Sequence, residues 1–131
     1  MGAPNYQTMR QVTPDVPGVR EDVRRWLERI EETRRVLNAV SLAGVDHASV
    51  TGILDVYGKA NSACQEARIE LPRFERRLRS WLFEPLSAEE RAACDEIASN
   101  LGRIRDATDS IGERAERLRA LAAAALRRNK A

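Results

Sequence analysis

An apolar heptad pattern runs without interruption through the middle of the chain, from about His47 to Glu84. Its apolar side chains recur at alternating intervals of three and four residues: Val50, Ile53, Tyr57, Ala60, Cys64, Ala67, Leu71, Phe74, Leu78 and Trp81. This is the period of a helix packed against partner helices. Such a helix would be on the order of 57 Å long, which is more than a surface helix of a compact globule needs. The pattern therefore predicts an elongated helical bundle.

Pro72 lies within this stretch but outside the apolar stripe. A proline inside a helix removes one hydrogen bond and clashes with the preceding turn, at a cost of ~3 kcal/mol or more. Because the heptad register continues past the proline, we expect a single helix over residues 47–84 that is kinked near Pro72.

Two further segments have the same apolar period. The first covers about residues 17–40, after a helix start at Asp15 and Pro17, and its stripe is Val19, Val23, Trp26, Ile30, Thr33, Leu37 and Val40. The other covers about residues 88–128, and its stripe is Cys94, Ile97, Leu101, Ile104, Thr108, Ile111, Ala115, Leu118, Ala122 and Ala125. Ser87 and Glu90 precede it as a capping box, in which each side chain accepts a hydrogen bond from the other residue's amide.

Three amphipathic helices with short connections predict an all-α fold, an antiparallel three-helix coiled-coil-like bundle with two long helices and a shorter first helix. Residues 17–128 would form this bundle, and residues 1–16 an N-terminal arm that is flexible or draped over it. Short turns predict that facing residue numbers add up to about 87 in helices one and two, and to about 172 in helices two and three. Trp26 would then lie level with Ala60 and Ile111, where small residues leave room for the indole.

The unequal helix lengths predict an interaction surface. In this register the first helix reaches along the second only as far as Leu71. The residues beyond that level lie on a two-helix hairpin that cannot enclose them: Phe74, Leu78, Trp81, Leu82 and Ile97. An exposed apolar patch of this kind marks an interface. The arm, a second copy of the chain or a different protein could cover it, and we expect a homodimer.

Basic residues predict an alternative function in nucleic-acid binding. The chain is rich in arginine and carries 22 basic and 20 acidic residues, a net charge of +2. The candidate nucleic-acid contacts form two clusters: Arg73, Arg76 and Arg77, and Arg127, Arg128 and Lys130. Antiparallel packing would place these clusters at opposite ends of the bundle, and the net charge is small for a phosphate-binding protein. The sequence therefore favours a protein partner.

The sequence contains no recognisable catalytic, cofactor or metal site. His47 is the only histidine, no acidic residue lies on any of the three stripes, and no glycine-rich phosphate loop occurs. Cys64 and Cys94 occupy stripe positions and are expected to act as small hydrophobic residues. We expect a protein that is not an enzyme and that has no cofactor or small-molecule substrate.

No apolar run approaches the ~20 residues of a membrane span, and the first ten residues lack the apolar core of an export signal. A cytoplasmic location is expected. The sequence thus predicts a non-enzymatic helical protein–protein interaction module, such as an adaptor, an assembly subunit or a small regulatory binder.

Overall fold

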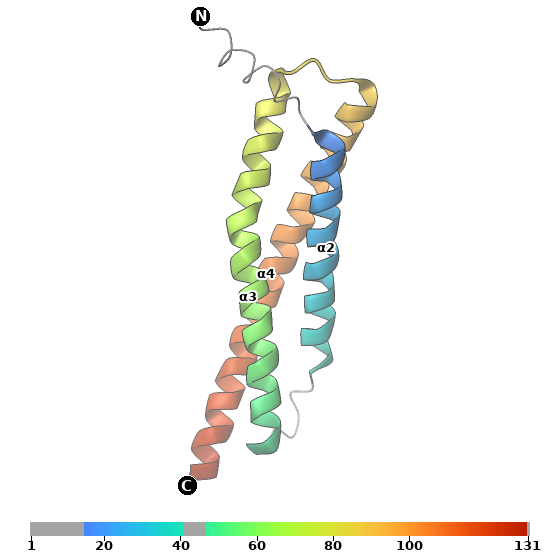
Figure 1. Cartoon of the computed structure of the whole chain (residues 1–131). Coiled ribbons are helices and arrows are strands. Elements are labelled where there is room, and N and C mark those ends of the chain that lie inside the picture. Colours follow the sequence, from blue (N-terminus) through green and yellow to red (C-terminus); the bar gives the residue numbers. More distant parts are fainter. Residues whose placement is uncertain (1–14, 41–46, 131) are drawn as a thin grey trace, which may run out of the picture.

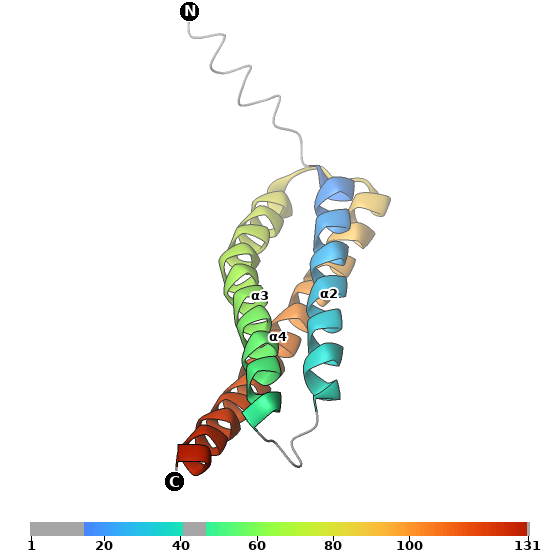
Figure 2. The same cartoon turned by 60° about the horizontal axis from the view of Figure 1, so that its bottom comes forward.

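The computed structural model describes residues 15–40 and 47–130. In this part of the chain, helices α2 (Val16–Ala39), α3 (His47–Ser80) and α4 (Ala88–Lys130) form an elongated bundle, with α3 antiparallel to the other two (Figures 1 and 2). A 3-10 turn, η1 (Trp81–Phe83), follows α3. The predicted all-α three-helix bundle with a shorter first helix is confirmed. Of the predicted arm, residues 1–14 lie outside the described residues. Its last two residues, Asp15 and Val16, form the start of α2 instead.

The predicted helix starts are present in the structure. The Asp15 carboxylate accepts a hydrogen bond from the Gly18 amide at 3.1 Å. At the start of α4, the Glu90 carboxylate accepts from the Ser87 amide at 2.9 Å, and the Ser87 hydroxyl accepts from the Glu90 amide at 3.1 Å. These contacts satisfy amide groups that lack partners within the first helical turn.

Helix α3 passes through Pro72 as one continuous α-helix, but it ends at Ser80 and not at Glu84. Pro85 explains why no helical turn continues past Phe83, because a proline disfavours the helical conformation of the residue before it. Glu84 accordingly has an extended backbone, with φ −91° and ψ 149°. The Ser80 hydroxyl donates to the Arg77 carbonyl at 2.7 Å, which satisfies one of the last carbonyl groups of the helix.

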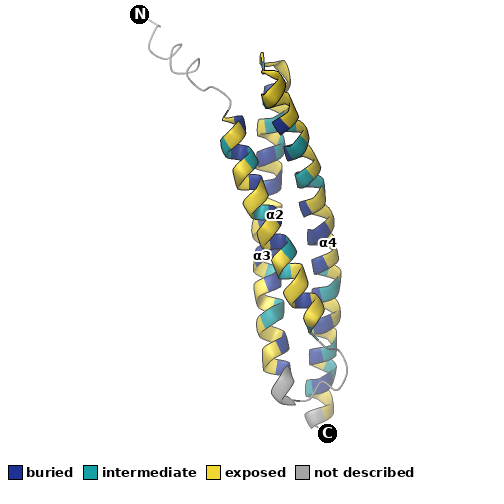
Figure 3. Cartoon of the chain, turned by 90° about the vertical axis from the view of Figure 1, so that its right-hand side faces the viewer, coloured by how far each residue is buried: buried dark blue, intermediate teal, exposed yellow. Residues whose placement is uncertain are grey.

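The core is a continuous strip of apolar side chains along the inner faces of the helices (Figure 3). Most stripe residues predicted from the sequence are buried, including Ile30, Ile104 and Leu118. The Cys64 thiol lies 3.7 Å from the Thr108 carbonyl oxygen across α3 and α4, and this pairing matches the predicted register of these two helices.

Helix α2 lies closer to the turn between α3 and α4 than the sequence predicted. The predicted register placed Gly58 opposite Arg29, whereas the Arg29 guanidinium contacts the Glu66 carboxylate at 2.6 Å. The difference is about eight residues, or ~12 Å along the helix axis. Two features permit it. Residues 40–46 connect α2 to α3, enough chain to span this distance, and a shift close to one heptad leaves the apolar stripes facing each other.

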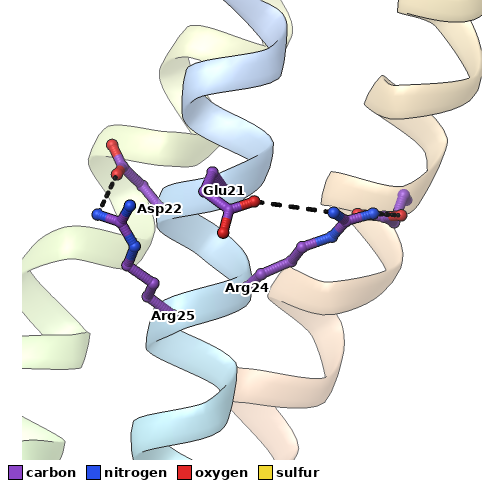
Figure 4. Close-up of polar contacts among 5 residues, drawn as sticks. Glu21, Asp22, Arg24 and Arg25 are labelled. Atoms are coloured by element: carbon purple, nitrogen blue, oxygen red, sulfur yellow. Dashed lines mark hydrogen bonds and ion pairs between the residues drawn. The ribbon is translucent and has the colours of Figure 1, made fainter.

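Ion pairs between α2 and α4 are consistent with this displaced position of α2. The Arg24 guanidinium binds the Glu96 carboxylate at 2.6 Å, and Arg103 binds Glu31 at 2.7 Å. Figure 4 shows Arg24 between the Glu21 carboxylate of its own helix and α4. The hydrogen bond from Arg24 holds the pKa of Glu96 below its usual range. These side chains are exposed, so each pair contributes little to stability, and the apolar core accounts for most of the packing energy.

The prediction that Trp26 fills the space beside Ala60 and Ile111 is wrong. Because α2 is displaced, Trp26 lies in a groove with Glu70 and Phe74. Its ring is only partly buried, and the Arg29 guanidinium stacks 5.0 Å from the ring centroid.

The displaced register predicts that Gly58→Ala stabilises the chain. A Cβ at Gly58, in the interior of α3, would meet no atom within 4 Å, so the variant should gain about 0.5–1 kcal/mol from reduced chain entropy and better helix propensity. Urea unfolding measures this change. Destabilisation by Gly58→Ala would instead support the predicted register, in which the small residues of α3 accommodate the indole.

Gly18→Ala provides a matched contrast to Gly58→Ala. The new Cβ would clash with the Asp15 carboxylate, so it would displace the N-terminal cap. We expect a loss of about 1 kcal/mol.

Candidate interaction surface at the hairpin end

The turn between α3 and α4 projects beyond the first residue of α2 (Figures 1 and 3). We call residues 73–98, which contain this turn and the adjoining helix ends, the hairpin end. Trp81 begins η1 and turns inward, with only 8% of its surface exposed. The next two residues point outward, and the exposed fractions are 73% for Leu82 and 92% for Phe83. The hairpin end therefore carries two large apolar side chains in solvent.

The local sequence explains this exposure. Successive residues of a 3-10 helix are rotated by about 120°, so three large apolar residues in a row cannot all face one core. Pro85 ends the helical backbone directly afterwards, and no further turn covers Phe83. Phe83 is not part of the predicted interface because the heptad stripe stops at Trp81. The run of three apolar residues before Glu-Pro was the signal that could have identified it.

A groove of about 500 Å³ lies beside the two exposed side chains. Its apolar lining comes from Leu78, Trp81, Leu82, Leu86 and Cys94. The remaining lining residues are Glu84, Arg91, Asp95 and Ala98. Elements on both sides of the turn thus contribute to one apolar surface with a polar border.

The structure corrects the predicted interface. Phe74, Trp81 and Ile97 are buried within the single chain, with exposed fractions of 6%, 8% and 0%. The premise that the first helix ends short of these residues is wrong, because α2 is displaced toward the hairpin end. Of the predicted set, Leu82 is exposed and Leu78 is half-buried in the groove. The accessible apolar surface is therefore smaller than predicted and centred on Leu82 and Phe83.

Charges at the hairpin end are divided between the two helices. On α3, Arg76, Arg77 and Arg79 are exposed and form no ion pair with the described residues. The neighbouring charges on α3 are engaged, since Arg73 binds Glu70 at 2.9 Å and Glu75 binds Arg105 of α4.

Carboxylates predominate after the turn. Glu84, Glu89 and Asp95 are exposed, and among the described residues they have no ion-pair partner. Glu90 is engaged in the cap of α4, and Glu96 binds Arg24. Free positive charge therefore lies on the α3 side of the apolar surface, and free negative charge lies mainly on the linker and α4 side.

The two arginine clusters proposed as nucleic-acid contacts do not form one surface. Arg73, Arg76 and Arg77 lie in the last turns of α3, at the hairpin end. Arg127 and Arg128 are exposed near the far end of α4, where α4 extends beyond α2 (Figure 1). Lys130 is the last residue of α4, and its side chain lies outside the described residues. The basic residues are thus separated by the length of the bundle.

Other chemistry-bearing residues are dispersed. His47 begins α3, and no group of three or more His, Cys, Asp or Glu within residues 15–40 and 47–130 could hold a metal ion. None of the described helices has the length and apolarity that crossing a membrane requires. Burial raises the pKa of both the Cys64 and Cys94 thiols.

Comparisons with protein-family models, with curated proteins and with solved structures found no match to this chain.

The two cysteines should differ in reactivity toward a thiol reagent such as dithionitrobenzoate. Cys94 is partly exposed at the groove, whereas Cys64 is buried in the core. One thiol per native chain should react readily, and the second should react only after denaturation. Cys94→Ser should remove the fast phase. A monomeric chain with a Cys64–Cys94 disulfide would contradict the structure, because Cys64 lies beside Thr108, about 14 residues or ~21 Å from Cys94 along α4.

Proposed function

We propose that this chain is a non-enzymatic helical protein–protein interaction module that binds its partner through the hairpin end. The single observation that carries the proposal is the 92% exposure of Phe83, beside the exposed Leu82, at the tip of a helical hairpin. Aromatic residues are enriched among the side chains that dominate binding energy at protein interfaces. A partner would remove both apolar side chains from water.

The surroundings of Phe83 support this proposal. Leu78 and Leu86 extend the apolar surface into the adjacent groove, and exposed charges border it. An apolar centre with a polar rim is the usual composition of a protein interface.

Site-specific crosslinking tests this function. A benzophenone amino acid in place of Phe83 would present a photoreactive ring at the tip, and the same residue in place of Ile69 serves as a control. Ile69 is 57% exposed and lies on α3 outside the hairpin end. Illumination in cells of the source organism should produce discrete protein adducts from position 83 and few from position 69. Equal labelling at both positions would contradict the proposal, and nucleic-acid adducts at position 83 would support the alternative function.

Phe83→Glu should abolish partner binding and leave the fold intact. The ring makes little contact with the core, so the free energy of unfolding should change by less than about 0.5 kcal/mol. The same variant should lose adducts formed by a photoreactive residue at Leu82. Ile69→Glu is the matched control and should retain them. A loss of several kcal/mol in urea unfolding would show instead that Phe83 packs within the chain.

A further inference from the structure

The hairpin end has a charge pattern that is complementary to itself. From Arg73 to Phe83 the chain has four arginines and one glutamate, and from Glu84 to Glu96 it has five carboxylates and one arginine. Some of these charges are engaged in ion pairs or in the cap of α4. Among the described residues, the arginines without an ion-pair partner on the α3 side of the turn are Arg76, Arg77 and Arg79. Glu84, Glu89 and Asp95 remain on the other, next to Arg91.

These charges lie on the two sides of the exposed apolar side chains along the chain. Arg76 and Arg79 are in the last turns of α3, seven and four positions before Phe83. Glu84 and Asp95 line the groove that also contains Leu82. The apolar centre therefore lies between a basic border on α3 and an acidic border formed by the linker and α4.

From this arrangement we infer that the partner at the hairpin end is a second copy of this chain, related by a twofold axis so that α3 of each copy lies against α4 of the other. This inference rests on the proposed function. A twofold axis makes every contact occur twice with the partners exchanged. The basic border of each copy would meet the acidic border of the other, while Leu82 and Phe83 of both copies pack at the centre.

Charge also selects among the twofold arrangements of two hairpins. An axis parallel to the bundle places α3 opposite α4 of the second copy, and so does an axis perpendicular to the plane of the hairpin. An axis across the hairpin, at right angles to the helices, places α3 on α3, which brings Arg76 and Arg79 against the same residues of the other copy. Like charges opposed across an interface are unfavourable, so the first two arrangements fit and the third does not.

Reversing the charges on one border at a time tests the inference. One variant is Arg76→Glu with Arg79→Glu, and the other is Glu84→Arg with Asp95→Arg. All four side chains are exposed, and urea unfolding verifies that each variant remains folded. Sedimentation at low salt should give a dimer for the unaltered chain. Each variant alone should self-associate at least about tenfold more weakly, because both symmetric contacts become repulsive.

An equimolar mixture of the two variants should associate again, since each reversed border then meets an oppositely charged one. Added salt should weaken association of the unaltered chain. The inference is overturned if the unaltered chain sediments as a 14.7 kDa monomer at about 100 μM, or if the folded variants fail to associate when mixed. In that case, adducts between position 83 and a different protein would still support the proposed function. If position 83 gave no specific adducts, both the proposed function and the inferred dimer would be wrong.

Discussion

The position of α2 along the α3–α4 hairpin determines which surfaces of this protein are buried. A helix of 24 residues cannot cover partners of 34 and 43 residues along their whole length. Its displacement toward the turn encloses Phe74 and Trp81 and leaves the far end of α4 beyond its reach (Figure 1). The displaced position thus buries two aromatic rings, each of which contributes a large apolar area to the core.

The end of α3 is decided locally, and it creates the exposed surface. Pro85 stops the helix, η1 tightens the last turn, and the Ser87–Glu90 capping box restarts the chain as α4. Trp81 is thereby directed into the core and Phe83 into solvent. The residues that end α3 and begin α4 thus also produce an apolar tip.

Electrostatics contributes little to the stability of this chain, and we propose that its larger role is in recognition. The interhelical pairs, such as Arg24 with Glu96, are exposed and individually weak. The charges that remain unpaired at the hairpin end are divided between its two sides. Such charges favour particular partners and orientations without adding much affinity. The apolar tip would supply the binding energy, and the charged borders would select what binds.

The sequence by itself determined the helices, their caps and the pairing of α3 with α4. Periodicity and local hydrogen bonding suffice for these features, and the short link 84–87 leaves the two long helices a narrow choice of register, so Cys64 lies beside Thr108 as expected. Only the tertiary structure decided where α2 lies, because a heptad pattern is nearly unchanged by a shift of one heptad and the connection 40–46 permits it. That shift buried Phe74 and Ile97, which had been predicted as an interface. Leu82 and Phe83 remain as the accessible apolar surface, because the local 3-10 turn directs them outward.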